Sequence, residues 1–146
     1  MAYGAVVVIG VGGMGEAIAR RQGPGHHLLI ADFNTDTLEK VAAGLRDDGF
    51  EVTTQQVDVS DAASVQALAD ASTELGHVRQ VIHTAGLSPV QASVDAILKV
   101  DLLGVALTLD AFGRVVARGG AGVVIASMAG TMAQGRFPAE MESALA

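Results

Sequence analysis

The sequence predicts a doubly wound α/β fold, in which helices cover both faces of a parallel sheet. Short apolar runs rich in valine and isoleucine alternate with longer stretches whose apolar residues recur at helical spacing. This alternation is typical of βαβ units. The chain has 146 residues, half of them hydrophobic, and a mean hydropathy of +0.42. It is therefore long and apolar enough for one globular domain over residues 1–146.

Five apolar runs are predicted to be strands: Ala5–Ile9, Leu28–Ala31, Glu51–Val57, Val78–His83 and Gly122–Ala126. A doubly wound sheet places the first strand in its middle, so the expected order is 3-2-1-4-5. The fifth run is as apolar as a strand that is covered on both faces, yet no later segment could form a strand beside it. An open apolar edge is an aggregation hazard. We therefore expect a sheet that is truncated after its fifth strand.

Helical spacing and capping residues predict the segments between the strands. The expected helices are Gly15–Arg21, one from Asp36 to about Gly49, one from near Asp61 to Gly76, a longer one over about Ser93–Val116, and the opening of another in the last residues, 138–146. Asp36 and Glu39 stand at capping-box spacing, which favours Asp36 as the start of the second helix. Gly49 and Gly76 are placed as helix-ending residues.

Composition excludes several kinds of partner and site. Nine Lys and Arg against 16 Asp and Glu give a formal net charge of −7, which disfavours nucleic acid and anionic membranes. The sequence contains no cysteine, and no His, Asp and Glu group has metal-ligand spacing, so no metal is expected. The N-terminal apolar stretch, Ala5–Ile9, is far shorter than the roughly 20 residues that span a bilayer. We expect a cytoplasmic protein.

A glycine-rich segment, Val8-Ile9-Gly10-Val11-Gly12-Gly13-Met14-Gly15, lies between the first predicted strand and the first predicted helix. The pattern GxGxxG in this context is typical of a dinucleotide-binding turn. Gly10 allows the tight turn, Gly12 lets the backbone approach a pyrophosphate, and Gly15 lets helix and strand pack closely. The N–H groups of the helix N-terminus favour the anion. The alternative is a tight strand–helix turn of some other α/β protein.

Asp32 ends the second strand, 22 residues after Gly10. This is close to the offset of about 20 residues at which an acidic side chain binds the adenosine ribose. The carboxylate would accept hydrogen bonds from the diol of NAD and repel the extra phosphate of NADP. Phe33 and Asn34 follow, so no adjacent Lys or Arg favours that phosphate. We therefore expect NAD in preference to NADP; the alternative for Asp32 is a helix-cap or loop carboxylate.

Five segments together resemble the short-chain dehydrogenase/reductase family in order and spacing: Gly13–Ala19, Asp58–Ser60, His83–Gly86, Val100–Gly104 and Val123–Gly130. They cover nearly the whole chain. The resemblance implies a Rossmann fold, a nicotinamide cofactor and hydride transfer to or from a small alcohol or carbonyl substrate. It also implies a homo-oligomer, because family members are commonly dimers or tetramers.

The resemblance and the glycine motif together nominate the cofactor-binding residues Gly10, Gly12, Gly13, Met14, Gly15, Asp32, Phe33, Asp58, Val59, Thr84, Ala85 and Gly86. Asp58 and Val59 match the pair that contacts the adenine ring, although Asp58 could instead cap a helix. The segment from His83 to Gly86 resembles the turn Asn-Asn-Ala-Gly beside the cofactor ribose. For His83 itself, hydrogen bonds to the local backbone are the favoured interpretation.

The resemblance nominates two catalytic residues and leaves two positions without a match. Ser127 falls where the family has the serine that holds the substrate oxygen. Asp101 stands where an asparagine usually organises a relay water, so that relay would be altered or absent. The Tyr-x-x-x-Lys pair that usually follows the serine is not found: Tyr3 is the single tyrosine, and Glu140 is a weak substitute acid. In divergent members with a similar glycine loop, an insertion precedes this pair, and residues 132–146 would begin such an insertion.

Two other classes of function stay open at this point. One is a dinucleotide-binding module or redox sensor without catalysis, which the aspartate at position 101 and the unmatched Tyr/Lys pair favour. The other is an assembly subunit whose fifth strand is completed by another chain. The preferred interpretation is that the parent protein is an NAD-dependent oxidoreductase and that these 146 residues alone are inactive.

Overall fold

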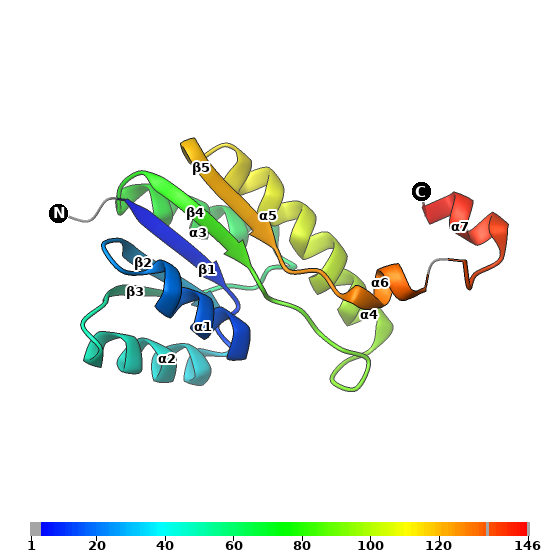
Figure 1. The fold of residues 1–146 in the computed structure, drawn as a ribbon, viewed down its shortest axis with the longest axis horizontal. Coiled ribbons are helices and arrows are strands. Elements are labelled where there is room, and N and C mark those ends of the chain that lie inside the picture. The colour runs from blue at the N-terminus through cyan, green and yellow to red at the C-terminus, as the bar shows by residue number, and fades with distance from the viewer. Residues whose placement is uncertain (1–3, 134, 146) are drawn as a thin grey trace.

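The computed structural model describes residues 4–133 and 135–145 and has the predicted α/β architecture (Figure 1). Its strands are β1 (Ala5–Ile9), β2 (His27–Asp32), β3 (Glu51–Gln56), β4 (Val78–His83) and β5 (Val116–Val124). They pair in parallel in the order β3-β2-β1-β4-β5. The expected order 3-2-1-4-5 is therefore confirmed.

Helices cover both faces of this sheet. They are α1 (Gly13–Gln22), α2 (Thr35–Asp47), α3 (Ala62–Glu74), α4 (Val94–Ile97), the π-helical segment η1 (Leu98–Leu103), α5 (Gly104–Gly113), α6 (Met128–Met132) and α7 (Ala139–Leu145). Buried residues of α1 and α2 pack on one face, and those of α3 and α5 pack on the other. The last two helices extend away from the sheet (Figure 1).

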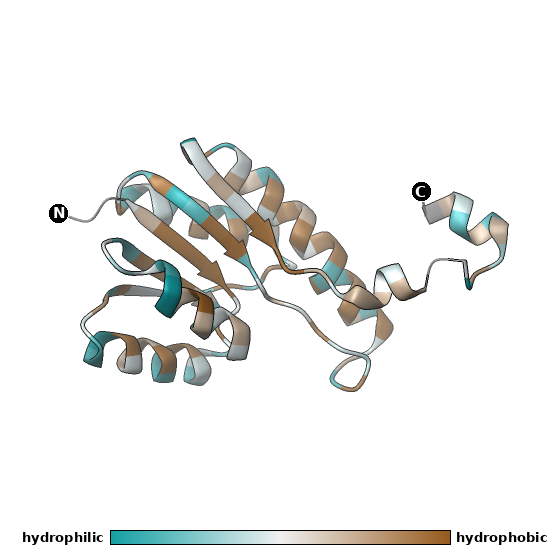
Figure 2. Cartoon of the chain, in the orientation of Figure 1, coloured by the Kyte–Doolittle hydropathy of each residue, from teal (hydrophilic) through white to brown (hydrophobic). Residues whose placement is uncertain are grey.

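The central strand β1 explains why the core has two halves. All five of its residues are fully buried. Because successive side chains of a strand point to opposite faces, Val7 and Ile9 join the core beneath α3 and α5, whereas Val6 and Val8 join the core beneath α1 and α2. Strand β1 is correspondingly hydrophobic along most of its length (Figure 2).

The second helix starts differently from the prediction. Its N-cap is Asn34, whose side chain accepts a hydrogen bond from the Thr37 N–H at 2.9 Å, and Asp36 lies in the first turn. The prediction that Asp36 caps this helix was wrong: the helix already begins at Thr35, one residue before Asp36, and the Asn34 side chain accepts from a free N–H of its first turn. Helix α1 likewise begins at Gly13, two residues before the predicted start.

The fifth strand is longer than the sequence pattern indicated. The predicted long helix ends at Gly113 instead of Val116, and β5 already begins at Val116 instead of Gly122. Gly119 adopts φ +80°, and the pairing of β4 with β5 shifts register between Val78 and Gln80. The glycines that permit this irregularity also interrupt the apolar pattern. The first half of the strand could therefore not be recognised from the sequence.

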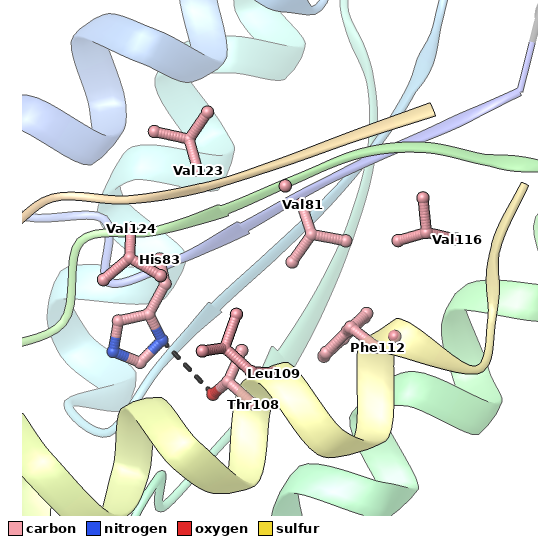
Figure 3. A pocket seen from close by; sticks show the side chains of 10 residues that line it. Val81, His83, Thr108, Leu109, Phe112, Val116, Val123 and Val124 are labelled. Atoms are coloured by element: carbon pink, nitrogen blue, oxygen red, sulfur yellow. Dashed lines mark hydrogen bonds between the residues drawn. The ribbon is translucent and has the colours of Figure 1, made fainter. Parts of the chain in front are cut away.

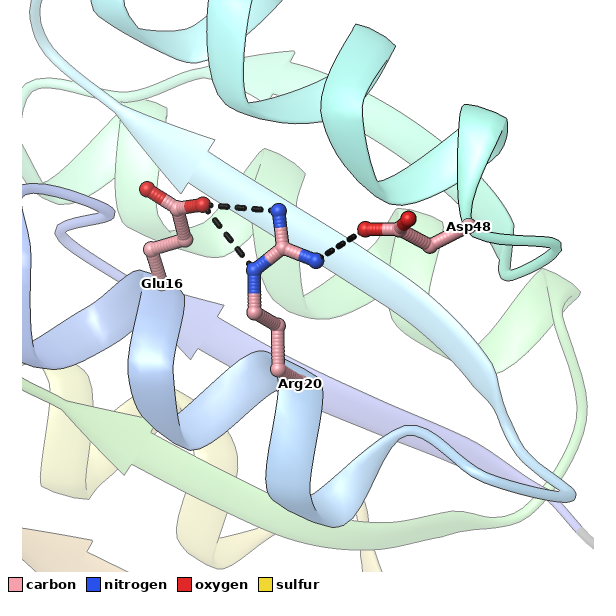
Figure 4. Close-up of polar contacts among 3 residues, drawn as sticks. All are labelled: Glu16, Arg20 and Asp48. Atoms are coloured by element: carbon pink, nitrogen blue, oxygen red, sulfur yellow. Dashed lines mark hydrogen bonds and ion pairs between the residues drawn. The ribbon is translucent and has the colours of Figure 1, made fainter.

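A charged side-chain network joins α1 to the end of α2 (Figure 4). The Arg20 guanidinium donates to Glu16 Oε1 at 2.9 Å and also to the Asp48 carboxylate. The bonds to Asp48 and Glu16 raise the pKa of Arg20. This network runs from the first turn of α1, where Glu16 lies, through Arg20 in the last turn of α1 to Asp48 at the end of α2.

Candidate functional site

A cavity of about 860 Å³ lies at the carboxyl ends of the strands, which is within the usual size range of small-ligand sites. It is bounded by the segments that follow β1, β2, β3 and β4 and by part of the α4–η1 helix. The lining residues are Gly10, Gly12, Gly13, Met14, Asp32, Phe33, Asn34, Val57, Asp58, Val59, Ser60, Thr84, Ala85, Gly86, Leu87, Gln91, Ala96, Lys99 and Val100. Eleven of the twelve nominated cofactor residues are among them; Gly15 is not.

The four glycines of the loop after β1 differ in what surrounds them. A Cβ on Gly10 would meet the Ala85 N at 2.6 Å, and one on Gly15 would overlap the Gly10 carbonyl oxygen. Packing within the chain therefore requires these two glycines. At Gly12 and Gly13, by contrast, no other group of the described residues lies within 4 Å of such an atom. Both residues line the cavity. Since packing within the chain does not require glycine at these two positions, the remaining physical reason for glycine is that a ligand approaches the backbone closely.

Helix α1 begins at the edge of this cavity. Gly12 is its N-cap, and no side chain among the described residues caps it. The free backbone donors and the helix dipole of a ten-residue helix favour an anion at this position. This end of the helix fits the pyrophosphate of a dinucleotide.

Asp32 holds the glycine loop in place. Its Oδ2 accepts from the Val11 N–H at 2.8 Å, and its Oδ1 accepts from the Asn34 N–H at 2.9 Å. Asp32 therefore acts in part as a loop carboxylate, which was the alternative role considered for it. Each carboxylate oxygen has a second acceptor site, and the residue lines the cavity, so the same group remains able to accept from a ribose diol.

The segment after β3 contains the pair nominated for adenine. Asp58 Oδ1 accepts from the N–H and the hydroxyl of Ser60, at 2.9 and 2.6 Å. The N-cap of α3 is Asp61, which accepts from the Ala63 N–H. The alternative of Asp58 as the helix cap was therefore wrong. Val59 is buried against α5, where a Cβ on Gly104 would meet Val59 Cγ2 at 2.8 Å.

The loop after β4 is hydrogen-bonded directly to the loop after β1. The N–H groups of Thr84 and Ala85 both donate to the Ile9 carbonyl, at 2.8 and 3.0 Å. The Thr84 hydroxyl also donates to the Gly10 carbonyl at 2.5 Å. These bonds fix one wall of the cavity relative to the glycine loop.

His83 precedes this loop and is 1% exposed. Its Nδ1 lies 3.3 Å from the Thr108 hydroxyl of α5, and its Nε2 has no hydrogen-bond partner among the described residues. The ring thus has a side-chain contact from a distant helix, and local backbone, at Ala85, also acts on it. Burial lowers the pKa of His83, an effect opposed by the Ala85 backbone and the Asp101 charge. His83 also borders a second, mainly apolar pocket between α5 and β5 (Figure 3).

The two nominated catalytic residues do not line the cavity. Asp101 lies in η1, and its Oδ1 accepts from the Leu87 N–H at 2.8 Å, so it fastens the loop after Gly86. Ser127 is exposed and accepts from the Ala129 N–H as the N-cap of α6. Glu140 lies on α7, away from the sheet (Figure 1). Tyr3 lies outside the described residues, as do residues 134 and 146 of the expected insertion.

Sequence reasoning missed several lining residues that come from one helix and the loop before it. Ala96, Lys99 and Val100 occupy one face of the α4–η1 segment, and Gln91 precedes it. Their helical spacing immediately before Asp101 was the available signal. The Lys99 ammonium pairs with Asp95 at 2.9 Å, which raises the pKa of Lys99.

Two negative findings apply to residues 4–133 and 135–145. No group of three or more His, Asp or Glu side chains in this part of the chain could hold a metal ion. No helix in it is long and apolar enough to cross a membrane.

Comparison with known proteins agrees with this geometry. The family model described as short chain dehydrogenase matches residues 4–139. A short-chain dehydrogenase/reductase of Alternaria brassicicola is 43% identical over 135 residues, which cover 92% of this chain and 49% of that protein. D-threitol dehydrogenase of Mycolicibacterium smegmatis is 34% identical and is covered to 54% of its length. The chain thus spans about half the length of these curated relatives.

Solved structures show the same fold. A short-chain dehydrogenase/reductase from Burkholderia phymatum in complex with NAD superposes with a TM-score of 0.79 at 30% identity, over 88% of this chain and 50% of that one. An alcohol dehydrogenase from Thermococcus sibiricus complexed with 5-hydroxy-NADP gives 0.72 at 34% identity, over 83% and 57%. Matched along nearly its whole length by the family model, the chain belongs to the short-chain dehydrogenase/reductase family.

Proposed function

We propose that the protein to which this chain belongs is an NAD-dependent oxidoreductase acting on a carbonyl or a secondary alcohol. The observation that carries the proposal is the placement of Asp32 between the glycine loop and the cavity. A carboxylate at this point accepts hydrogen bonds from a ribose diol and repels a phosphate on the same sugar. The relative in complex with NAD supports this proposal, and the one complexed with 5-hydroxy-NADP shows that the fold accepts either cofactor type.

In this proposal each part of the cavity has a distinct task. The nicotinamide, when bound, supplies the hydride chemistry, and the chain supplies position and electrostatics. The α1 N-terminus and Gly12 hold the pyrophosphate, Asp32 holds the adenosine ribose, and Asp58 accepts from the adenine amine. Phe33 is 68% exposed at the rim and gives the adenine an apolar surface. Ser127 would hold the substrate oxygen, whereas no residue of this chain is assigned the proton transfer.

A second candidate is a dinucleotide-binding module without catalysis. It is favoured by Asp101, whose carboxylate has no amide donor and is engaged by the Leu87 N–H. Both candidates require the same cofactor cavity, so cofactor binding tests what they share. Turnover of a panel of secondary alcohols with NAD by the parent protein distinguishes them.

Calorimetric titration of this chain with NAD and with NADP tests the proposed preference. We expect NAD to bind at least about tenfold more tightly than NADP, because hydrogen bonds to a charged group contribute about 1.5–3 kcal/mol. Asp32→Ala should weaken NAD binding by about tenfold or more and abolish the preference. Asp36→Ala, an exposed carboxylate on α2 outside the cavity, is the matched control and should bind like the parent chain. Equal affinity of the parent chain for the two dinucleotides would contradict the proposal.

A further inference from the structure

The carboxylate of Asp101 lies directly against one wall of the cofactor cavity. Its Oδ1 accepts from the Leu87 N–H at 2.8 Å. A Cβ on Gly86 would lie 3.6 Å from Oδ1 and 4.0 Å from Oδ2 of the same carboxylate. Gly86 and Leu87 both line the cavity, whereas Asp101 does not. Because Gly86 has no side chain, the carboxylate lies against the bare backbone of this wall.

The local helix geometry brings Asp101 to this loop. The residue lies in η1, a π-helical segment between the α-helices α4 and α5. Single π-helical turns inside α-helices are rare and are frequently found at functional sites. Lys99 and Val100, the two preceding residues, line the cavity, while Asp101 bonds to the loop after Gly86.

No cation of the described residues is paired with the negative charge of Asp101. The ion pairs within residues 4–133 and 135–145 do not include it. Lys99, which lines the cavity, is paired with Asp95 at 2.9 Å, so these two residues together add little net charge. Burial lowers the pKa of His83, and the Asp101 charge opposes this effect. The field of the carboxylate therefore reaches groups at the end of β4.

The strand order places this wall beside one half of a dinucleotide. Asp32 and Asp58 follow β2 and β3, on one side of the central strand β1, whereas residues 84–87 follow β4, on the other side (Figure 1). The N-terminus of α1, which fits the pyrophosphate, follows β1 and lies between them. With the adenosine on the side of β2 and β3, the nicotinamide half extends toward the loop after β4 and thus toward Asp101.

The two redox forms of the cofactor differ in charge in this half. The nicotinamide ring is positively charged in NAD⁺ and neutral in NADH, whereas the phosphates and the adenosine are the same in both forms. A carboxylate near the ring therefore attracts the ring of NAD⁺ alone. Its repulsion of the phosphates cancels when the two forms are compared. Because Asp101 is exposed, water and salt weaken this attraction.

We propose that Asp101 makes the cofactor site selective for the oxidised form of NAD. The proposal rests on the proposed function and deepens it, because it adds a preference between redox forms to the preference for NAD over NADP. An asparagine, which the family usually has at this position, would offer the Leu87 N–H the same kind of acceptor but would lack the charge. The aspartate of this chain thus keeps the bond to the loop and adds an electrostatic preference.

Calorimetric titration with NAD⁺ and with NADH tests the proposal on the parent chain and its variants. In Asp101→Asn, affinity for NAD⁺ should fall about three- to tenfold, whereas affinity for NADH should change by less than about twofold. Asp101→Ser is a second uncharged variant with an oxygen acceptor and should give the same shift. Asp36→Asn removes one negative charge from an exposed position on α2 outside the cavity, so both affinities should stay at the parent level.

Ionic strength distinguishes a charge effect from a change in the loop. Between about 0.02 and 0.5 M salt, the difference in NAD⁺ affinity between the parent chain and Asp101→Asn should shrink, because screening shortens the reach of the charge. A displaced loop would weaken NAD⁺ and NADH alike at every salt concentration. That result, or an unchanged ratio of the two affinities, would overturn the proposal and leave the dinucleotide site intact. If the parent chain bound neither form, the proposed function would fail and this inference with it.

Discussion

Replacing Gly15 by alanine is expected to destabilise the domain by about 3 kcal/mol or more, or to prevent it from folding. The new Cβ would overlap the carbonyl oxygen of Gly10 and lie 3.0 Å from the Thr84 hydroxyl. That carbonyl is itself fixed by the hydrogen bond from Thr84. The backbone of the loop after β1 would therefore have to move at Gly10, and the Thr84 hydroxyl that is bonded to it would have to shift as well. Such a backbone shift costs more than the rotation of a flexible side chain. Urea unfolding followed by circular dichroism measures the change.

Gly13→Ala is the matched control for this prediction. Gly13 is the first residue of α1, and no group of the described chain lies within 4 Å of the added atom. Alanine favours a helix over glycine by about 1 kcal/mol, so stability should be unchanged or slightly increased. NAD binding should nevertheless weaken, since the methyl group enters the proposed pyrophosphate site. If both variants lost the same amount of stability, the contact between the Gly10 carbonyl and position 15 would not be the reason that this position requires glycine.

Acidification is expected to destabilise the domain through His83. Burial lowers the pKa of this ring below its value of about 6.5 in an unfolded chain. Below about pH 6.5 the unfolded chain therefore binds a proton that the folded chain does not. Stability should fall by up to about 1.4 kcal/mol per pH unit between the unfolded and the folded pKa. Above that range both states hold a neutral ring, and the His83 contribution should not vary with pH.

The measurement is the pH dependence of the unfolding free energy for the parent chain and for His83→Gln. Other histidines and the carboxylates titrate in both proteins, so the difference between the two curves isolates His83. Glutamine keeps an amide near the Thr108 hydroxyl, and His83→Asn provides a second variant if glutamine packs poorly. Parallel curves for the parent chain and a folded variant would refute the assignment of acid sensitivity to this ring.

The family resemblance and the order of the strands could both be predicted from local patterns. Apolar runs of strand length, glycines at fixed offsets and an acidic residue at the end of β2 are encoded by residues that are close in sequence. Eleven nominated cofactor residues consequently line one cavity, because the carboxyl ends of neighbouring parallel strands lie at the same edge of a sheet. The role of each of these residues stays a prediction until binding is measured.

What tertiary structure decided is how particular side chains are used. Asp32 bonds to Val11, 21 positions away, and Asp101 bonds to Leu87, 14 positions away; no local pattern encodes either bond. The same holds for His83, whose contact with Thr108 follows from packing α5 on β4. The first half of β5 escaped prediction because its glycines break the apolar pattern, while pairing with β4 supplies its hydrogen bonds. The sequence by itself thus determined the family, the sheet order and the dinucleotide motif, because these depend on local periodicity and spacing. Only the tertiary structure decided which loops the carboxylates hold, because this depends on contacts between segments distant in sequence.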